Sequence, residues 1–97
     1  MGIQSEQRQI LTARREITIV NELGLHARPA TEFVRCASKF RSEVFLVRDG
    51  RRLSAGSMIE VLMADLCQGQ TAILEAHGSD AELAVETLAE LISSFRD

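Results

Sequence analysis

The stretch Glu16–Phe40, EITIVNELGLHARPATEFVRCASKF, decides the fold because the spacing of its apolar residues changes partway along it. Glu16–Val20 is rich in β-branched residues and predicts a strand. Asn21–Gly24 follows as a loop, whose glycine is free to take a positive φ. From residue 27 onward apolar residues recur at steps of three and four, which predicts one helical stripe: Ala27, Ala30, Phe33, Val34, Ala37 and Phe40. Pro29 falls in the first turn, where a missing N–H costs nothing because first-turn donors lack an intrahelical acceptor.

The rest of the chain alternates between strand and helix patterns. Strands are predicted over Glu43–Arg48, Arg51–Ala55 and Thr71–His77, and Asp49-Gly50 is a hairpin signal between the first two. Two helices are predicted to begin at capping boxes, in which a serine and a glutamate three residues later bond each other's backbone N–H; the boxes are Ser57–Glu60 and Ser79–Glu82. The first helix is expected to bury Ile59, Leu62, Met63 and Leu66, and the second Ala84, Leu88, Leu91, Ile92 and Phe95.

The predicted order of elements is βαββαβα. It favours an α+β, open-faced two-layer sandwich, with a four-stranded antiparallel sheet and three helices on one face. The 97 residues suit one domain, assigned to residues 15–97, after a polar N-terminal extension over residues 1–14.

The open face of the sheet is expected to show Phe45, Val47 and Ile73, and an apolar patch of this kind often marks a contact. One hypothesis is that Ile10 and Leu11 fold over this patch, or that it pairs with another chain. The alternative is that the extension is a loose tail over scattered apolar residues.

Composition narrows the function classes. The net charge is -3 and the chain has no Trp or Tyr, which argues against a nucleic-acid partner. No apolar run approaches the roughly 20 residues of a membrane span, and residues 1–14 lack the apolar region of a secretory signal, so we expect a cytoplasmic protein without membrane insertion. Cys36 and Cys67 lie far apart without metal-ligand spacing, and we expect two reduced thiols, no metal and no cofactor.

The candidate chemistry lies in Gly24–Ala30, GLHARPA, where a loop delivers a histidine to the start of a helix. The free N–H groups at a helix start and the helix dipole favour an anion. A phosphoryl group on His26 would accept bonds from the backbone of Ala27 and Arg28, and the Arg28 guanidinium would add charge-assisted bonds. Before transfer, the same positive field disfavours the imidazolium and keeps a lone pair free for attack. The alternative is that His26 is only a helix cap and Arg28 only a solvated charge, and spacing alone does not decide between them.

The seven residues GLHARPA resemble the active-site signature of the HPr family, the histidine-containing phosphocarriers of the bacterial phosphoenolpyruvate-dependent phosphotransferase system. The resemblance runs from about Glu16 to Phe95, through further segments in the family's order: Ala37–Phe40, Gly56–Ile59, Gly69 and Ala76–Gly78. It implies the HPr-like open-faced β-sandwich, which agrees with the element order above. In the block Leu62–Asp65 the chain looks more like the nitrogen-regulatory branch of the family.

The resemblance implies a phosphocarrier and not an enzyme with its own turnover. Enzyme I would pass a phosphoryl group to Nδ1 of His26, giving a pros-phosphohistidine stabilised by Arg28, and a IIA-type protein would accept it, in sugar uptake or its regulation. One alternative is an HPr-like regulatory adaptor in nitrogen or carbon control that acts by binding alone, although an adaptor needs no nucleophile at His26. Another is an independent hydrolase or transferase, against which the chain offers no Ser-His-Asp order, P-loop or paired carboxylates near His26.

Two further roles follow from the resemblance. Ser57 matches the family's regulatory serine, which makes HPr kinase an additional expected partner; the alternative is a helix cap only, and Glu60 would repel a phosphate there. Partners are expected to dock on the two helices around the histidine, over Ala27, Thr31, Arg35, Met58, Ile59 and Leu62. One of Ile59 and Leu62 is expected to be core. The acidic residues Glu60 and Asp65 are expected to weaken docking of acidic partners.

Overall fold

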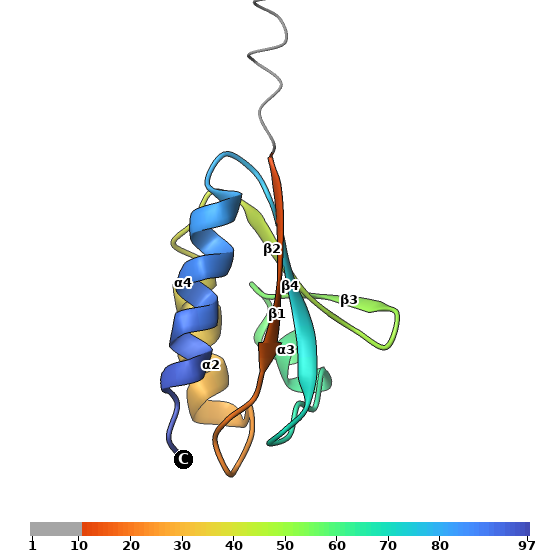
Figure 1. Cartoon of the computed structure of the whole chain (residues 1–97), viewed down its shortest axis with the longest axis vertical. Coiled ribbons are helices and arrows are strands. Elements are labelled where there is room, and N and C mark those ends of the chain that lie inside the picture. Colours follow the sequence, from red (N-terminus) through yellow and green to blue (C-terminus); the bar gives the residue numbers. More distant parts are fainter. Residues whose placement is uncertain (1–10) are drawn as a thin grey trace, which may run out of the picture.

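The computed structural model describes residues 11–97, which form an antiparallel sheet with three helices on one face (Figure 1). The predicted α+β class and βαββαβα order are confirmed. In chain order the elements are β1 (Thr12–Thr18), α2 (Ala27–Ala37), β2 (Glu43–Arg48), β3 (Arg51–Ser54), α3 (Met58–Met63), β4 (Thr71–His77) and α4 (Ala81–Ser94).

The four strands lie in the order β1-β4-β2-β3, and every neighbouring pair is antiparallel. Strand β1 begins four residues earlier than predicted, at Thr12, and ends at Thr18 rather than Val20. Residues 12–14, assigned to the extension from their polar composition, pair with β4 because backbone bonds to a neighbouring strand need no apolar side chain. Leu11 is 48% exposed, and Ile10 lies outside the described residues.

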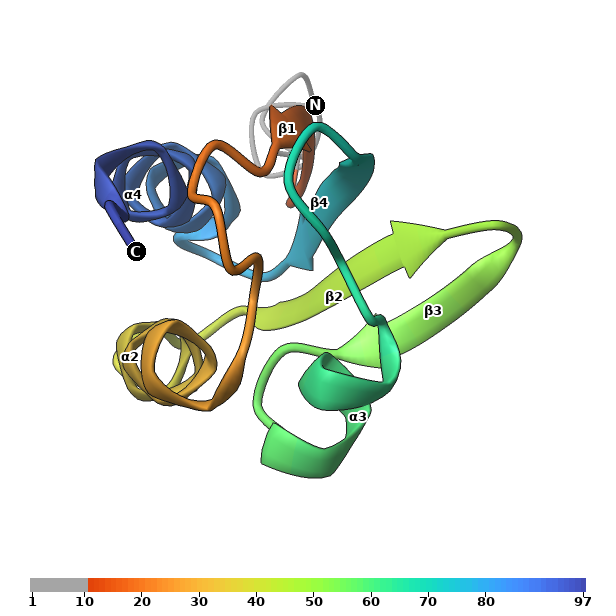
Figure 2. The ribbon, with the colours of Figure 1, turned by 90° about the horizontal axis from the view of Figure 1, so that it is seen from below.

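One core lies between the sheet and the helices. Figure 2 looks along the sheet and shows all three helices on the same side of it. The largest fully buried side chains come from every layer: Phe33, Ile19, Leu46, Leu74, Leu88, Ile92, Val61 and Pro29. The predicted inner stripe of α4 is confirmed at Ala84, Leu88, Ile92 and Phe95, while Leu91 is partly buried against the core. Helix α2 ends at Ala37, so Phe40 packs against the core from the loop that follows.

The predicted burial along α3 is wrong for three of four residues. Ile59, Leu62 and Met63 are 72%, 41% and 53% exposed, and Leu66, just past the helix, is buried as expected. The six-residue helix turns Val61 toward the core instead. Three apolar side chains therefore face solvent on α3, where periodicity alone favours a buried stripe.

Neither capping box forms as predicted. Ser57 does cap α3 by accepting a bond from the backbone N–H of Glu60 at 3.2 Å, but the Glu60 carboxylate accepts from the N–H of Ser54 at 2.8 Å, not from Ser57. At α4 the N-cap is Asp80 rather than Ser79, and its side chain makes no cap bond. That carboxylate instead accepts bonds from the backbone and hydroxyl of Ser42 and the backbone of Arg41, which lower the pKa of Asp80.

The open face of the sheet is more polar than its apolar residues suggest. Phe45, as predicted, points to this face and is half-buried, but the Arg52 guanidinium lies over its ring, 4.2 Å from the centroid. Nearby, His77 contacts the Glu75 carboxylate through Nε2 and the Thr12 hydroxyl through Nδ1. The hydrogen bond from His77, aided by the Arg52 charge and opposed by burial, lowers the pKa of Glu75.

Candidate functional site

The loop before α2 is held against the segment that follows α3. The N–H of Leu25 donates to the carbonyl of Leu66 at 2.9 Å. Gly24 has φ +71°, as its predicted freedom allows, and a Cβ there would lie 2.5 Å from the same Leu66 oxygen. Only glycine therefore fits at this position, and the close packing fixes where the next residues, including His26, begin the helix.

His26 occupies the N-cap position of α2. Its carbonyl accepts the first helical bond, from the N–H of Ala30 at 2.9 Å, but its ring makes no capping bond. The ring nitrogen Nε2 is buried and has no hydrogen-bond partner among the described residues, whereas 34% of the side chain is exposed. The ring therefore does not act as a helix cap, and Nδ1 is its accessible nitrogen.

The first turn of α2 has unused hydrogen-bond donors beside this ring. Within residues 11–97 no acceptor is found for the backbone N–H of Ala27 or Arg28, and Pro29 has no N–H to satisfy. Pro29 is fully buried and anchors the turn in the core. The arrangement leaves two N–H groups and the positive end of the helix dipole free for an anion next to His26.

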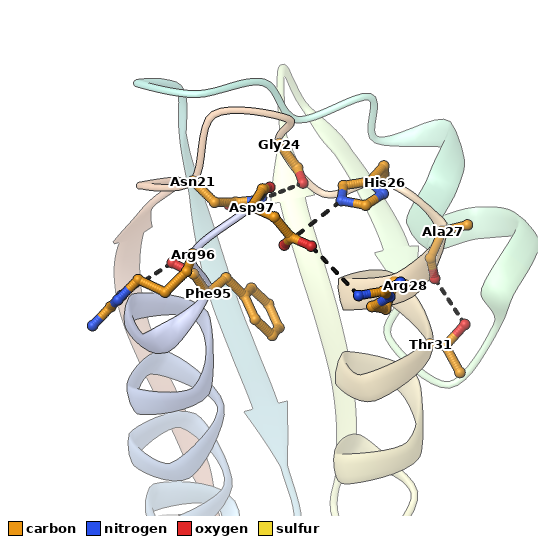
Figure 3. A network of polar contacts seen from close by, with 9 residues as sticks. All are labelled: Asn21, Gly24, His26, Ala27, Arg28, Thr31, Phe95, Arg96 and Asp97. Atoms are coloured by element: carbon orange, nitrogen blue, oxygen red, sulfur yellow. Dashed lines mark hydrogen bonds and ion pairs between the residues drawn. The ribbon is translucent and has the colours of Figure 1, made fainter.

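Asp97 lies between His26 and Arg28 (Figure 3). One oxygen of its carboxylate is 3.9 Å from His26 Nε2 and the other is 3.8 Å from a guanidinium nitrogen of Arg28, whose side chain is 78% exposed. The backbone of Asp97 is fixed by the buried Asn21, whose amide donates to its carbonyl at 2.8 Å and to the carbonyl of Gly24 at 2.7 Å.

Sequence reasoning identified His26 and Arg28 but missed Asn21 and Asp97. The asparagine in the loop just before the signature is a local signal that could have been used, because Asn side chains often bond the backbone of their own loop. Nothing in the sequence pairs it with a residue 76 positions away, because only the packing of α4 beside β1 brings Asp97 to the loop.

The residues expected to dock partners lie beside His26 on α2 and α3. The Thr31 hydroxyl donates to the carbonyl of Ala27 at 2.8 Å and contacts the Met58 sulfur at 3.8 Å, which ties the two helices together. The expectation that Ile59 or Leu62 belongs to the core is wrong, since both are exposed. Ala27, Thr31 and Arg35 are exposed too, and Met58 is half-buried.

The charges on α3 are arranged differently from the expectation. The Glu60 carboxylate accepts a bond from the backbone N–H of Ser54 at 2.8 Å, so its charge is directed to the end of β3. Asp65 has φ +48°, and its carbonyl and that of Ala64 accept bonds from Arg48. A basic side chain thus offsets the negative end of this short helix.

Within the described residues the structure contains no cluster of potential metal ligands and no helix that is long and apolar enough to cross a membrane. Both cysteines are free; Cys67 is exposed and Cys36 is partly buried.

A family model, two related sequences and a solved structure all place the chain with the same family. Residues 13–94 match the family model described as the PTS HPr component phosphorylation site. The chain is 38% identical over 83 residues to the phosphocarrier protein NPr of Shewanella violacea (86% of this chain, 91% of the relative) and 37% identical over 84 residues to the phosphocarrier protein HPr of Borreliella burgdorferi (87% and 98%). A crystal structure of HPr from Thermoanaerobacter tengcongensis superposes with a TM-score of 0.81 at 39% identity, covering 84% of this chain and 92% of the other.

Proposed function

The chain belongs to the HPr family of phosphotransferase-system phosphocarriers, and we propose that it accepts a phosphoryl group on Nδ1 of His26 from phospho-enzyme I and passes it to a IIA-type acceptor in the cytoplasm. The observation that carries the proposal is the pairing of an accessible Nδ1 with a buried Nε2 at the start of α2. The ring has one nitrogen open to a partner, and two unused backbone donors lie beside it.

The chemistry follows from these groups. The Nδ1 lone pair attacks phosphorus while the bond to the donor protein breaks and its electrons stay with the donor. The phosphoryl oxygens then accept bonds from the N–H groups of Ala27 and Arg28. The guanidinium of Arg28 is exposed, and among residues 11–97 its one ion-pair partner is Asp97 at 3.8 Å, so it can turn to the phosphoryl group at little cost.

Partner docking is proposed to use the exposed apolar side chains of α3. Ile59, Leu62 and Met63 form an apolar centre beside α2, and Arg28 and Arg35 supply basic charge at its edge. Because the Glu60 carboxylate is turned toward Ser54, it opposes an acidic partner less than the sequence suggests. The nearly equal identity to an NPr and an HPr makes sugar uptake and its regulation equally compatible with this surface.

Ser57 is proposed as a second phosphorylation site, for an HPr kinase. Its side chain already accepts the bond from Glu60 N–H at the start of α3, and a phosphate there would keep this interaction while adding negative charge next to Met58 and Ile59. Incubation with the kinase and ATP should give an acid-stable phosphate that is absent from Ser57→Ala. Equal labelling of both proteins would reject this role.

The transfer itself is tested by mixing the protein with enzyme I and phosphoenolpyruvate and measuring intact mass. We expect a gain of one acid-labile phosphoryl group that is lost in His26→Ala. The chain has only one other histidine, so His77→Ala is a matched control and should be phosphorylated like the original protein. Phosphorylation that persists in His26→Ala would contradict the proposal.

A further inference from the structure

Asp97 presents a carboxylate to the ring nitrogen of His26 that transfer does not use. Its oxygen lies 3.9 Å from Nε2, which is too far for a hydrogen bond but within ion-pair range. Nε2 is buried and makes no other polar contact within residues 11–97. Figure 3 shows this nitrogen directed toward the carboxylate. A negative charge at this position favours an N–H over a bare lone pair at Nε2.

The position of Asp97 does not depend on its own side chain. Its carbonyl accepts bonds from the Asn21 amide at 2.8 Å and from the N–H of Leu23 at 3.3 Å, while nearby Phe95 is buried in the core. Asn21 also bonds Gly24 O, so one buried amide joins the loop that carries His26 to the residue that faces its ring.

We propose that Asp97, held in place by Asn21, is a positioning residue that keeps the imidazole proton of His26 on Nε2 and so leaves the Nδ1 lone pair free for phosphorus. The inference rests on the proposed function. It adds that the imidazole proton of His26 is carried by Nε2 and that Asp97 keeps it there. Asp97 itself does not contact the phosphoryl group.

The same contact acts in both directions of transfer. When the phosphorus–Nδ1 bond forms, the Nε2 proton stays and the ring gains positive charge, which the carboxylate stabilises. When an acceptor nucleophile bonds phosphorus, the electron pair of the breaking bond returns to Nδ1, and the ring leaves as neutral imidazole because Nε2 is still protonated. Among the described residues, Asp97 is the one charged side chain in ion-pair contact with the ring, and Arg28 contacts its other oxygen.

The test compares the unphosphorylated protein with Asp97→Asn, using histidines labelled with ¹⁵N and long-range ¹H–¹⁵N correlation to read the tautomer of His26. We expect the ratio of Nε2–H to Nδ1–H to fall, because the carboxylate charge about 4 Å from Nε2 no longer stabilises an N–H dipole there. Asp97→Glu should restore most of the ratio, and Asn21→Ala should lower it. Glu86→Gln removes a surface carboxylate elsewhere and should leave it unchanged. An unchanged ratio in Asp97→Asn would overturn the inference.

The pH profile of phosphoryl transfer supplies a second readout, which a purely structural role would not move. With Asp97→Asn, the acid limb of the profile, where the ring loses its free lone pair, should shift to lower pH by about 0.7 unit, the fivefold change expected for two unit charges about 4 Å apart in water. A profile that stays in place would contradict the role. The tautomer is measured without phosphate, so failure of all phosphorylation would reject the proposed function, whereas normal phosphorylation with an unaltered tautomer would reject this inference alone.

Discussion

The buried amide of Asn21 donates a 2.8 Å hydrogen bond to the carbonyl of Asp97, which joins two residues 76 positions apart. The same nitrogen bonds the carbonyl of Gly24. The loop that presents His26 is therefore fastened to the far end of the sequence as well as to the segment after α3.

Replacing Asn21 with alanine should destabilise the protein. Two carbonyl groups would lose a buried donor, which costs about 1–3 kcal/mol. Chemical unfolding in urea should show this as a lower midpoint with an unchanged slope. Ser93→Ala, which removes an exposed side-chain bond to the carbonyl of Glu90, is the control and should change the midpoint little.

Gly24→Ala and Gly50→Ala separate backbone strain from steric clash. Both glycines have a positive φ, +71° and +77°, so alanine costs about 1–2 kcal/mol of conformational strain at either position. At Gly24 the new Cβ would meet the Leu66 oxygen at 2.5 Å, whereas at Gly50 no atom of the described residues lies within 4 Å. Gly24→Ala should therefore unfold at lower urea and accept phosphate more slowly than Gly50→Ala. Equal behaviour of the two variants would show that the clash is relieved without consequence.

The sequence predicted the element order, the core face of α4 and the position of His26, because each depends on local periodicity or on a short motif. It failed on α3, where three of the apolar residues face solvent, since periodicity reports an apolar face but not what covers it. It also failed at Thr12, where pairing with β4 and not composition defines the strand. The contact between His26 and Asp97 could not be predicted from the sequence, because the two residues meet only after the whole chain has folded.

Ile59→Ser should weaken docking without weakening the fold. The side chain is 72% exposed, so its loss removes little buried area within the protein, but a partner seated on α3 would lose an apolar contact. We expect the KM for phospho-enzyme I to rise about tenfold, equivalent to ~1.4 kcal/mol, with an unchanged unfolding midpoint. Leu83→Ser is the matched control, since Leu83 is 61% exposed on α4. A similar KM increase in both variants would argue against a specific site on α3.

Glu75 should make the stability of the sheet depend on pH. The hydrogen bond from His77 lowers the pKa of Glu75 in the folded state, so the unfolded chain binds the proton more readily. The stabilisation is present above the unfolded pKa of about 4.3 and is lost as the pH falls through the lower folded value.

Glu75→Gln should accordingly be less stable than the original protein near pH 7, and the difference should shrink as the pH falls below about 4. Urea unfolding across this range measures it. The surface carboxylate of Glu86, paired with Arg15, provides the comparison: Glu86→Gln should show a smaller difference at pH 7. A Glu75→Gln difference that stayed constant down to pH 3 would refute this explanation.

The most direct test of the account is to locate the phosphorus atom on protein labelled with ¹⁵N-histidine and phosphorylated through enzyme I. We predict that phosphorus–nitrogen coupling appears on Nδ1 of His26, while Nε2 keeps its proton and the signals of His77 do not change. Coupling at Nε2 of His26 or at His77, or the absence of any phosphorylated histidine, would contradict the account.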